Sequence, residues 1–149
     1  MKMRTASLGL LLVWLLANPV SRVRAQQDET IYDADVKVVK YEVMKYPGPA
    51  GLQGRRGVVV VRVKLDREGK VVDATAISGD GVLNVYSLEN AKKWRFEPNS
   101  HNAAILVYNF RLIDLPASCG ADYVTHFVFY PPNFVSVTGC GFSAYVGEH

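Results

Sequence analysis

The sequence lacks the short motifs that mark common catalytic and metal sites. It contains no Gly-x-Ser-x-Gly nucleophile elbow and no His-Glu-x-x-His zinc helix. Its three histidines, His101, His126 and His149, share no metal-ligand spacing. The run from Gly139 to Ala144 imitates a dinucleotide-binding fingerprint, but no helix or second βαβ half follows it. The sequence therefore predicts a protein that is not an enzyme and that uses no metal and no cofactor.

Cysteine is also scarce, because the chain contains only Cys119 and Cys140. Their separation excludes a Cys-x-x-Cys redox pair, and two thiols are too few for a structural zinc site. In an exported protein a lone pair of cysteines usually forms one disulfide. We therefore expect a Cys119–Cys140 disulfide, with two free thiols as the alternative.

The N-terminus predicts a signal peptide. Lys2 and Arg4 form a short positive region before an apolar stretch of ten residues, Leu8 to Ala17, and Pro19 follows shortly after that stretch. The residues Val-Arg-Ala that end at Ala25 then offer a cleavage site. The alternative is a retained membrane anchor, but a spanning helix needs roughly 20 mainly apolar residues. We expect cleavage after Ala25 and export of the remainder.

No net positive charge remains once the predicted signal peptide is removed. The whole chain has 17 Lys and Arg against 14 Asp and Glu. Lys2, Arg4, Arg22 and Arg24 leave with the signal and no acid does, so 17 less 4 leaves 13 basic against 14 acidic side chains. The exported protein then has a net charge near −1, and its charge gives no reason to expect a nucleic-acid partner.

The mature chain predicts one ordinary domain without low-complexity segments. Residues 26–35 are polar and acidic, as expected of a flexible N-terminus. Residues 36–43 roughly alternate between apolar and polar, which favours a short strand or an extended arm. The prolines at 47 and 49 end it.

A β-hairpin is the clearest predicted element. From Gly57 to Asp66 one face is wholly apolar, and that face consists of Val59, Val61, Val63 and Leu65. The residues from Asp66 to Gly69 predict a tight turn with Gly69 in the left-handed conformation. The return strand is expected over 70–78.

A helix and a third strand follow. The spacing of Val85, Leu88 and Ala91 predicts a helix over 84–95 with a narrow apolar stripe against the sheet. Trp94 and Phe96, just after it, are expected in the core. Ala104 to Leu112 alternates as a strand, with Leu106, Tyr108, Phe110 and Leu112 on one face. The order strand, strand, helix, strand predicts an α+β fold with a small antiparallel sheet and one packed helix.

Beyond residue 114 the sequence predicts a C-terminal extension over 115–149. Two aromatic-rich segments, 123–130 and 134–145, predict an additional hairpin around Pro131-Pro132-Asn133. The aromatic side chains indicate either a small satellite core behind the disulfide or a recognition surface.

Several residues of the body, taken in order, resemble the C-terminal domain of TonB. The resemblance covers about residues 36–112 and rests on Tyr46-Pro47, Gly57 opening a Val-rich strand, Asp66 with Gly69-Lys70-Val71, Ser78-Gly79, and Leu88, Ala91 and Trp94-Arg95-Phe96-Glu97-Pro98.

This resemblance implies a binding mode. TonB domains of this type lie in the periplasm and capture a short segment of an outer-membrane receptor as an extra strand beside the closing strand. The corresponding edge here lies within Ala104–Leu112, and Tyr46 and Pro47 are a second candidate contact. The implied contact residues of the edge are Ala104, Ile105, Leu106, Val107, Tyr108, Asn109, Phe110 and Arg111. The alternative is that the C-terminal extension covers this edge, since open edges favour aggregation.

The sequence also departs from TonB. A working TonB keeps an N-terminal membrane helix and a long Pro-rich spacer, and this chain shows a removable signal and no such spacer. We therefore expect a periplasmic, non-catalytic protein-binding domain linked to transport across the outer membrane. The alternatives are a component of a TonB-type energy transducer with a retained anchor, and an exported enzyme or inhibitor that reuses the scaffold. A homodimer is left open.

Overall fold

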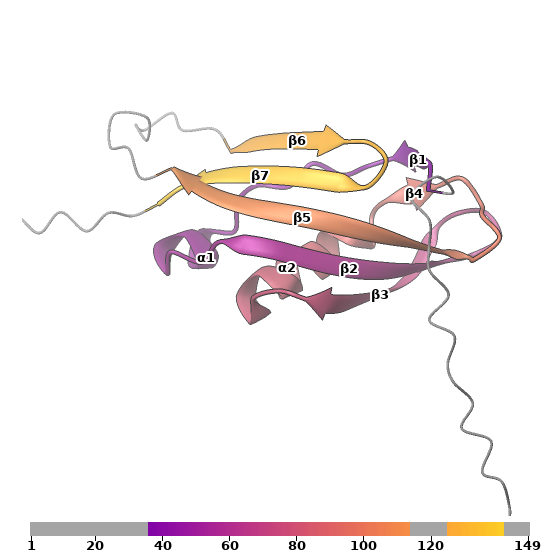
Figure 1. Ribbon diagram of the computed structural model, residues 1–149, viewed down its shortest axis with the longest axis horizontal. Helices are drawn as coiled ribbons and strands as arrows, with labels where there is room; N and C mark the ends of the chain where they lie inside the picture. Colours follow the sequence, from indigo (N-terminus) through magenta and orange to yellow (C-terminus); the bar gives the residue numbers. More distant parts are fainter. Residues whose placement is uncertain (1–35, 114–124, 142–149) are drawn as a thin grey trace, which may run out of the picture.

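The computed structural model describes residues 36–113 and 125–141 (Figure 1). The predicted signal peptide, the N-terminus at 26–35, Cys119 and the boundary at 114–115 lie outside these residues. The elements in chain order are β1 (Val38–Lys40), α1 (Gly48–Leu52), β2 (Gly57–Leu65), β3 (Val71–Ser78), α2 (Gly81–Ala91), β4 (Arg95–Phe96), β5 (Ala103–Ile113), β6 (His126–Tyr130) and β7 (Phe134–Cys140).

Within the described residues the main sheet has five strands, in the order β3-β2-β5-β7-β6. β2 pairs antiparallel with β3 and β5, and β6 pairs antiparallel with β7. β7 pairs with β5 in parallel, from Val107 opposite Phe134 to Ile113 opposite Cys140. A separate pair, β1 and β4, is antiparallel.

The predicted α+β class is confirmed, but the expectation of an antiparallel sheet was incomplete. The C-terminal hairpin joins the sheet, and the sheet becomes mixed because β6 lies one position further out than β7. β6 runs opposite to β5, and β7 returns between them, so β7 must run parallel to β5. Within residues 36–113 and 125–141 the structure also has two helices, whereas the sequence predicted one.

The predicted alternation of the central strands is confirmed. On β2, Val59, Val61 and Val63 are completely buried, and on β5 Leu106 and Tyr108 are as well. One face of the sheet therefore carries the core, as a period of two requires.

The predicted turn after β2 also forms. The Asp66 carboxylate accepts hydrogen bonds from the backbone N–H groups of Glu68 and Lys70, both at 2.9 Å. Gly69 has φ +78°, and a Cβ there would lie 1.8 Å from the carbonyl oxygen of Phe96. Only glycine fits this position.

The predicted helix exists, and Ala91 and Leu88 of its predicted stripe lie against the core, but its bounds and the position of Val85 differ from the prediction. It begins at Gly81 because the Asp80 side chain caps it, accepting from the N–H groups of Val82 (2.9 Å) and Leu83 (3.3 Å). Val85, expected in the buried stripe, is 53% exposed. The residues that α2 buries are Leu83, Ser87, Asn90 and Ala91.

Two of these buried residues are polar, and Asn90 organises the core beside it. Its Oδ1 accepts hydrogen bonds from Trp94 Nε1 at 2.9 Å and from the Tyr108 hydroxyl at 3.0 Å, and its Nδ2 donates to the carbonyl oxygen of Glu42 at 2.9 Å. Trp94 and Phe96 are both 1% exposed, so their predicted place in the core is confirmed.

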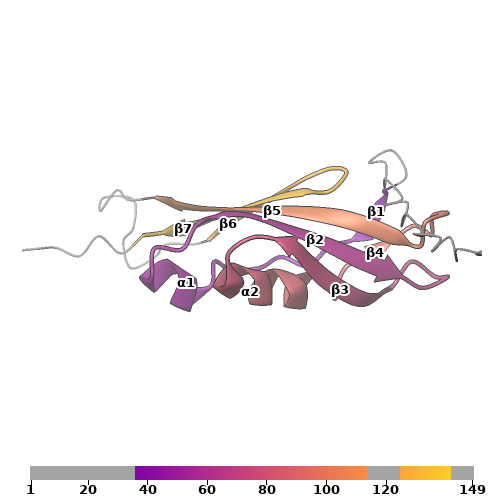
Figure 2. The ribbon, with the colours of Figure 1, turned by 60° about the horizontal axis from the view of Figure 1, so that its bottom comes forward.

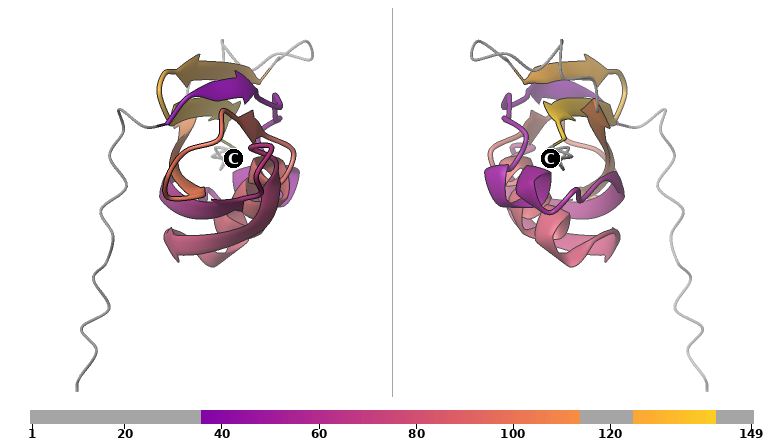
Figure 3. Two further views of the ribbon diagram at one scale, coloured as in Figure 1. Left: turned by 90° about the vertical axis from the view of Figure 1, so that its right-hand side faces the viewer. Right: turned by 90° about the vertical axis from the view of Figure 1, so that its left-hand side faces the viewer.

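The molecule has two layers. Both helices lie on one face of the sheet, as Figures 2 and 3 show, and within the described residues no helix covers the other face. The expected strand over 36–43 is reduced to β1, which pairs with β4. Over residues 36–113 and 125–141, no helix is long and apolar enough to span a membrane.

Candidate functional site

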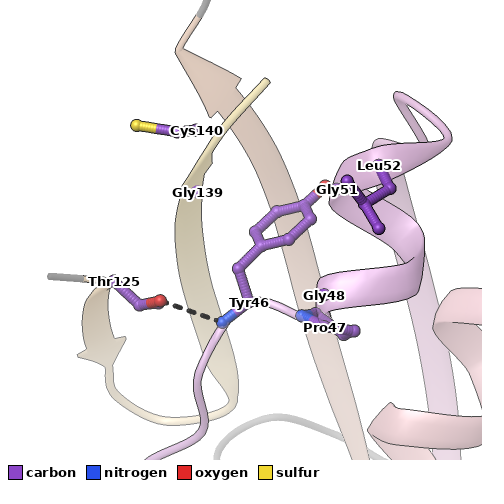
Figure 4. A pocket seen from close by; sticks show the side chains of 8 residues that line it. All are labelled: Tyr46, Pro47, Gly48, Gly51, Leu52, Thr125, Gly139 and Cys140. Carbon is purple, nitrogen blue, oxygen red and sulfur yellow. Dashed lines mark hydrogen bonds between the residues drawn. The ribbon is translucent and has the colours of Figure 1, made fainter. Parts of the chain in front are cut away.

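Tyr46 and Pro47 line a cleft between α1 and the end of β7 (Figure 4). The cleft has a volume of about 400 Å³ and is also lined by Gly48, Gly51, Leu52, Thr125, Gly139 and Cys140. Pro47 precedes the helix, and Pro49 occupies its first turn, where a missing N–H costs nothing. These prolines therefore end the extended segment and start α1, which places the Tyr46 ring over β7.

Tyr46 is held on several sides. Its backbone N–H donates to Thr125 Oγ1 at 3.1 Å, and its hydroxyl donates to the carbonyl oxygen of Arg55. Its ring meets that of Phe110 edge to face, with centroids 5.7 Å apart. A Cβ at Gly139 would lie 2.4 Å from Tyr46 Cγ, so the ring rests directly on the backbone of β7.

The electrostatics of Tyr46 do not suit acid–base chemistry at neutral pH. Burial raises the pKa of Tyr46 to about 12; the Arg56 guanidinium opposes this shift and the Asp80 carboxylate adds to it. The hydroxyl stays protonated at neutral pH and serves as a hydrogen-bond donor. Tyr46 therefore packs on the core, and its role in contacting a partner stays a prediction.

The predicted edge of β5 is occupied by the chain itself. From Val107 to Ile113 the side of β5 away from β2 pairs with β7, and the N–H of Val107 also donates to the carbonyl oxygen of Asn133 at 3.0 Å. Of the two alternatives that the sequence left open, an open edge and an edge covered by the C-terminal extension, the covered edge is the one found for Val107, Tyr108, Asn109, Phe110 and Arg111. Their backbone groups are used on both sides of the strand, because the hairpin supplies the neighbouring strand.

The first part of β5 extends beyond this pairing. Ala103 to Leu106 pair with β2, and the β7 register begins only at Val107. Ala104 and Leu106 have fully buried side chains, and Ile105 is half-buried on the other face. The two groups of predicted contact residues, Tyr46-Pro47 and the β5 edge, meet at the ring contact between Tyr46 and Phe110. Ala104–Leu106 lie toward the opposite end of β5.

Among the described residues, no group of three or more His, Cys, Asp and Glu side chains could hold a metal ion. Cys140 ends β7, and its side chain points away from Tyr46 (Figure 4). Because Cys119 lies outside the described residues, the Cys119–Cys140 disulfide stays a prediction. The site offers main-chain edges and apolar side chains, which suit the recognition of another protein.

A comparison with known protein families identifies one match. The model of the C-terminal domain of Gram-negative bacterial TonB proteins matches residues 42–112. These residues belong to the TonB C-terminal domain family. No curated protein and no solved structure matches the chain.

The TonB C-terminal domain family consists of non-catalytic protein-interaction domains of the periplasm. The segment that matches the family, residues 42–112, contains Tyr46, Pro47 and the predicted contact residues of β5. The β6–β7 hairpin lies outside it. The part of the chain that occupies the β5 edge is therefore an addition to the family's pattern.

The sequence reasoning missed one feature, the outer edge of β6. β6 is the last strand in the sheet order, and no described strand pairs with its outer side. The signal was present, since HFVFY contains no lysine, arginine, aspartate, glutamate, glycine or proline. The sequence predicted the hairpin and left open that it covers β5, but it did not show which of the two hairpin strands would lie at the outside of the sheet.

Proposed function

We propose that this protein is an exported, non-catalytic protein-binding domain of the periplasm that takes up an extended segment of a partner by strand addition at β6. Membership of the TonB C-terminal domain family supports the class of function. The observation that carries the location is the outer side of β6, which no strand occupies within the described residues. Main-chain hydrogen bonds along this edge supply affinity, and alternate side chains supply selectivity.

The β5 edge is a poor alternative because β7 is built into the core. Val135 and Val137 of β7 are completely buried. Exposing two such side chains costs about 3–6 kcal/mol, at roughly 1.5–3 kcal/mol each. A partner that replaced β7 would have to repay this cost, whereas one that joins β6 would not. The binding edge has therefore moved outward by two strands.

The side chains of β6 define what an added strand would meet. Phe127 and Phe129 point to the core side, where the Tyr41 ring lies 6.0 and 5.1 Å from their ring centroids. Val128 is 42% exposed and Tyr130 is 52% exposed. Tyr41, which is 46% exposed, adds apolar surface on the core side of β6, next to Phe127 and Phe129. An extended segment with apolar side chains at alternate positions fits this surface.

The family suggests the first class of partner to test. TonB C-terminal domains interact with proteins such as outer-membrane receptors. We propose that the bound segment belongs to a protein of this kind and that the interaction serves transport across the outer membrane.

A peptide titration tests the edge. The probe is a fluorescently labelled peptide of about seven residues in which Val and Thr alternate, long enough to span a short strand. Val128→Lys places a charge on the edge and should weaken binding at least about tenfold. Val72→Lys makes the same change on β3, where Val72 is 62% exposed, and should leave binding unchanged. Equal binding by wild type and Val128→Lys would exclude β6 as the site.

A further inference from the structure

The two outer edges of the sheet differ in how they are protected against pairing. β3 has two register shifts against β2, and it carries Asp73 on its exposed side. Bulges and charges are the usual devices that prevent a strand from pairing with another chain. β6 pairs with β7 through an unbroken register and carries no charged residue of the Lys, Arg, Asp or Glu type. Of the two outermost described strands, β6 is the one with a regular, uncharged edge.

The sequence of β6 is also complementary to itself. When two copies run antiparallel around Val128, Val128 faces Val128, Phe127 faces Phe129, and His126 faces Tyr130. Aromatic and β-branched pairs across antiparallel strands are stabilising, and no like-charged Lys, Arg, Asp or Glu pair is created. The odd length of five residues places Val128 on the symmetry axis.

We infer that β6 pairs with β6 of a second copy of this protein, in antiparallel register around Val128, and joins two five-stranded sheets into one. The inference and the proposed function both rest on an accessible outer edge of β6, but the dimer does not require that a partner segment binds there. A paired copy occupies the edge, so the monomer is the form that takes up a partner segment.

The symmetry of this arrangement limits its growth. Pairing β6 with β6 is isologous, so it consumes both regular edges and ends the assembly. Pairing β6 with β3 would leave one of each edge open and would build filaments. The register shifts of β3 oppose that second arrangement. A closed dimer is therefore the product that these two edges allow.

The core side of the new junction is apolar as well. Tyr41 lies against Phe127 and Phe129, and Phe129 also meets Trp94 with ring centroids 5.3 Å apart. Pairing would bring Phe127 of one copy opposite Phe129 of the other. The aromatic cluster would thus continue across the junction and cover the exposed side of Tyr41.

Sedimentation analysis of the purified protein tests the dimer. From about 1 μM to 1 mM, wild type should shift from monomer to dimer, a range that covers weak and moderate affinities. Val128→Lys should raise the dissociation constant at least about tenfold, and Val72→Lys should leave it unchanged. A wild type that stays monomeric throughout, or a dimer that Val128→Lys does not weaken, would overturn the inference.

Crosslinking tests the register independently, including the case in which Val128→Lys fails to fold. Val128→Cys should form a disulfide-linked dimer on mild oxidation, because its two copies face each other across the axis. His126→Cys should not, because its two copies would lie about 13 Å apart, four residues along the strand. Wild type provides the background from its own cysteines. Equal crosslinking of both variants, or none by Val128→Cys, contradicts the register.

The two proposals fail separately. A protein that is monomeric at every concentration but binds the Val-Thr peptide would refute the dimer and retain the proposed function. A dimer that binds no peptide, even when diluted to monomer, would retain the inference and refute peptide capture.

Discussion

The segment that matches the TonB family and the hairpin beyond it contribute alike to one core. β2, inside the match, supplies Val59, Val61 and Val63 at 0% exposure, and β7, outside it, supplies Val135 and Val137 at 0% exposure. All five belong to a single hydrophobic cluster. The difference lies in position, since the family's strands fill the middle of the sheet and the hairpin forms one edge of it. A family match thus marks shared ancestry without marking where the core ends.

The position of the hairpin in the sheet affects which strand edge is available to a partner. The match ends at residue 112, and the hairpin then covers the edge that the family resemblance implies for partner capture. An added element that is buried this deeply changes which edge is available. If the hairpin is structurally equivalent to the matched segment, substitutions in either should destabilise the fold to a similar extent.

Removing the hairpin should have the largest effect. A chain truncated after Ile113 loses two fully buried valines, and those alone account for about 3–6 kcal/mol. That loss is comparable to the whole stability of many domains, about 5–15 kcal/mol. We expect the truncated protein to lose its cooperative thermal unfolding transition in circular dichroism. A melting temperature equal to that of the intact protein would show that the matched segment is stable alone.

Gly139→Ala should have the next largest effect, about 3 kcal/mol. Its new Cβ would lie 2.4 Å from Tyr46 Cγ and 2.8 Å from Tyr46 Cβ, so the base of the side chain, rather than a flexible end, must move. Gly48→Ala is the control, because nothing lies within 4 Å of a Cβ there. Urea denaturation measures both. Equal stability of the two variants would mean that β7 and Tyr46 are not tightly packed.

One buried valine in each region allows the two regions to be tested with the same substitution. Val61→Ala on β2 and Val137→Ala on β7 delete the same atoms from side chains that are both completely buried. Each should cost about 2 kcal/mol through lost burial and the cavity that remains. Urea denaturation of the two variants gives the values directly. A cost for Val137→Ala well below that for Val61→Ala would show that the hairpin is only loosely attached.

The sequence predicted which residues form strands better than it predicted what packs or pairs against those strands. The alternation of Val59, Val61 and Val63 predicted the core face of β2 because apolar residues with a period of two leave no other arrangement. The buried face of α2 was predicted only in part. Ala91 is buried as expected and Val85 is not, and Ser87 and Asn90 were missed because their burial depends on hydrogen bonds within the fold. Local hydrophobicity contains no sign of such partners.

The candidate site shows the same limit. Ala104–Leu112 was recognised as a strand, but whether its edge is open depends on a parallel pairing with residues 134–140. No local pattern encodes that pairing, since a parallel neighbour can come from far along the chain. The Tyr46-Pro47 pair was identified, whereas its contact with Gly139 across more than ninety positions was not.

Tyr46→Phe should have the smallest effect, and it probes where the two regions touch. The variant loses the hydrogen bond from the hydroxyl to the Arg55 carbonyl, which is worth about 1 kcal/mol near neutral pH. It keeps the ring against Gly139 and Phe110, so the fold should persist. Urea denaturation at neutral pH measures this loss.

The pH dependence gives Tyr46→Phe a second readout. Burial raises the pKa of Tyr46 from 10.0 to about 12, so the folded state holds this proton more tightly than the unfolded state. The stability that this group provides is complete below pH 10 and is lost as the pH rises through about 12. Tyr108, whose pKa burial also raises, contributes a loss of the same sign in both proteins. Wild type should therefore lose more stability than Tyr46→Phe between pH 10 and 12. Parallel curves would mean that the Tyr46 hydroxyl is not buried in the folded state.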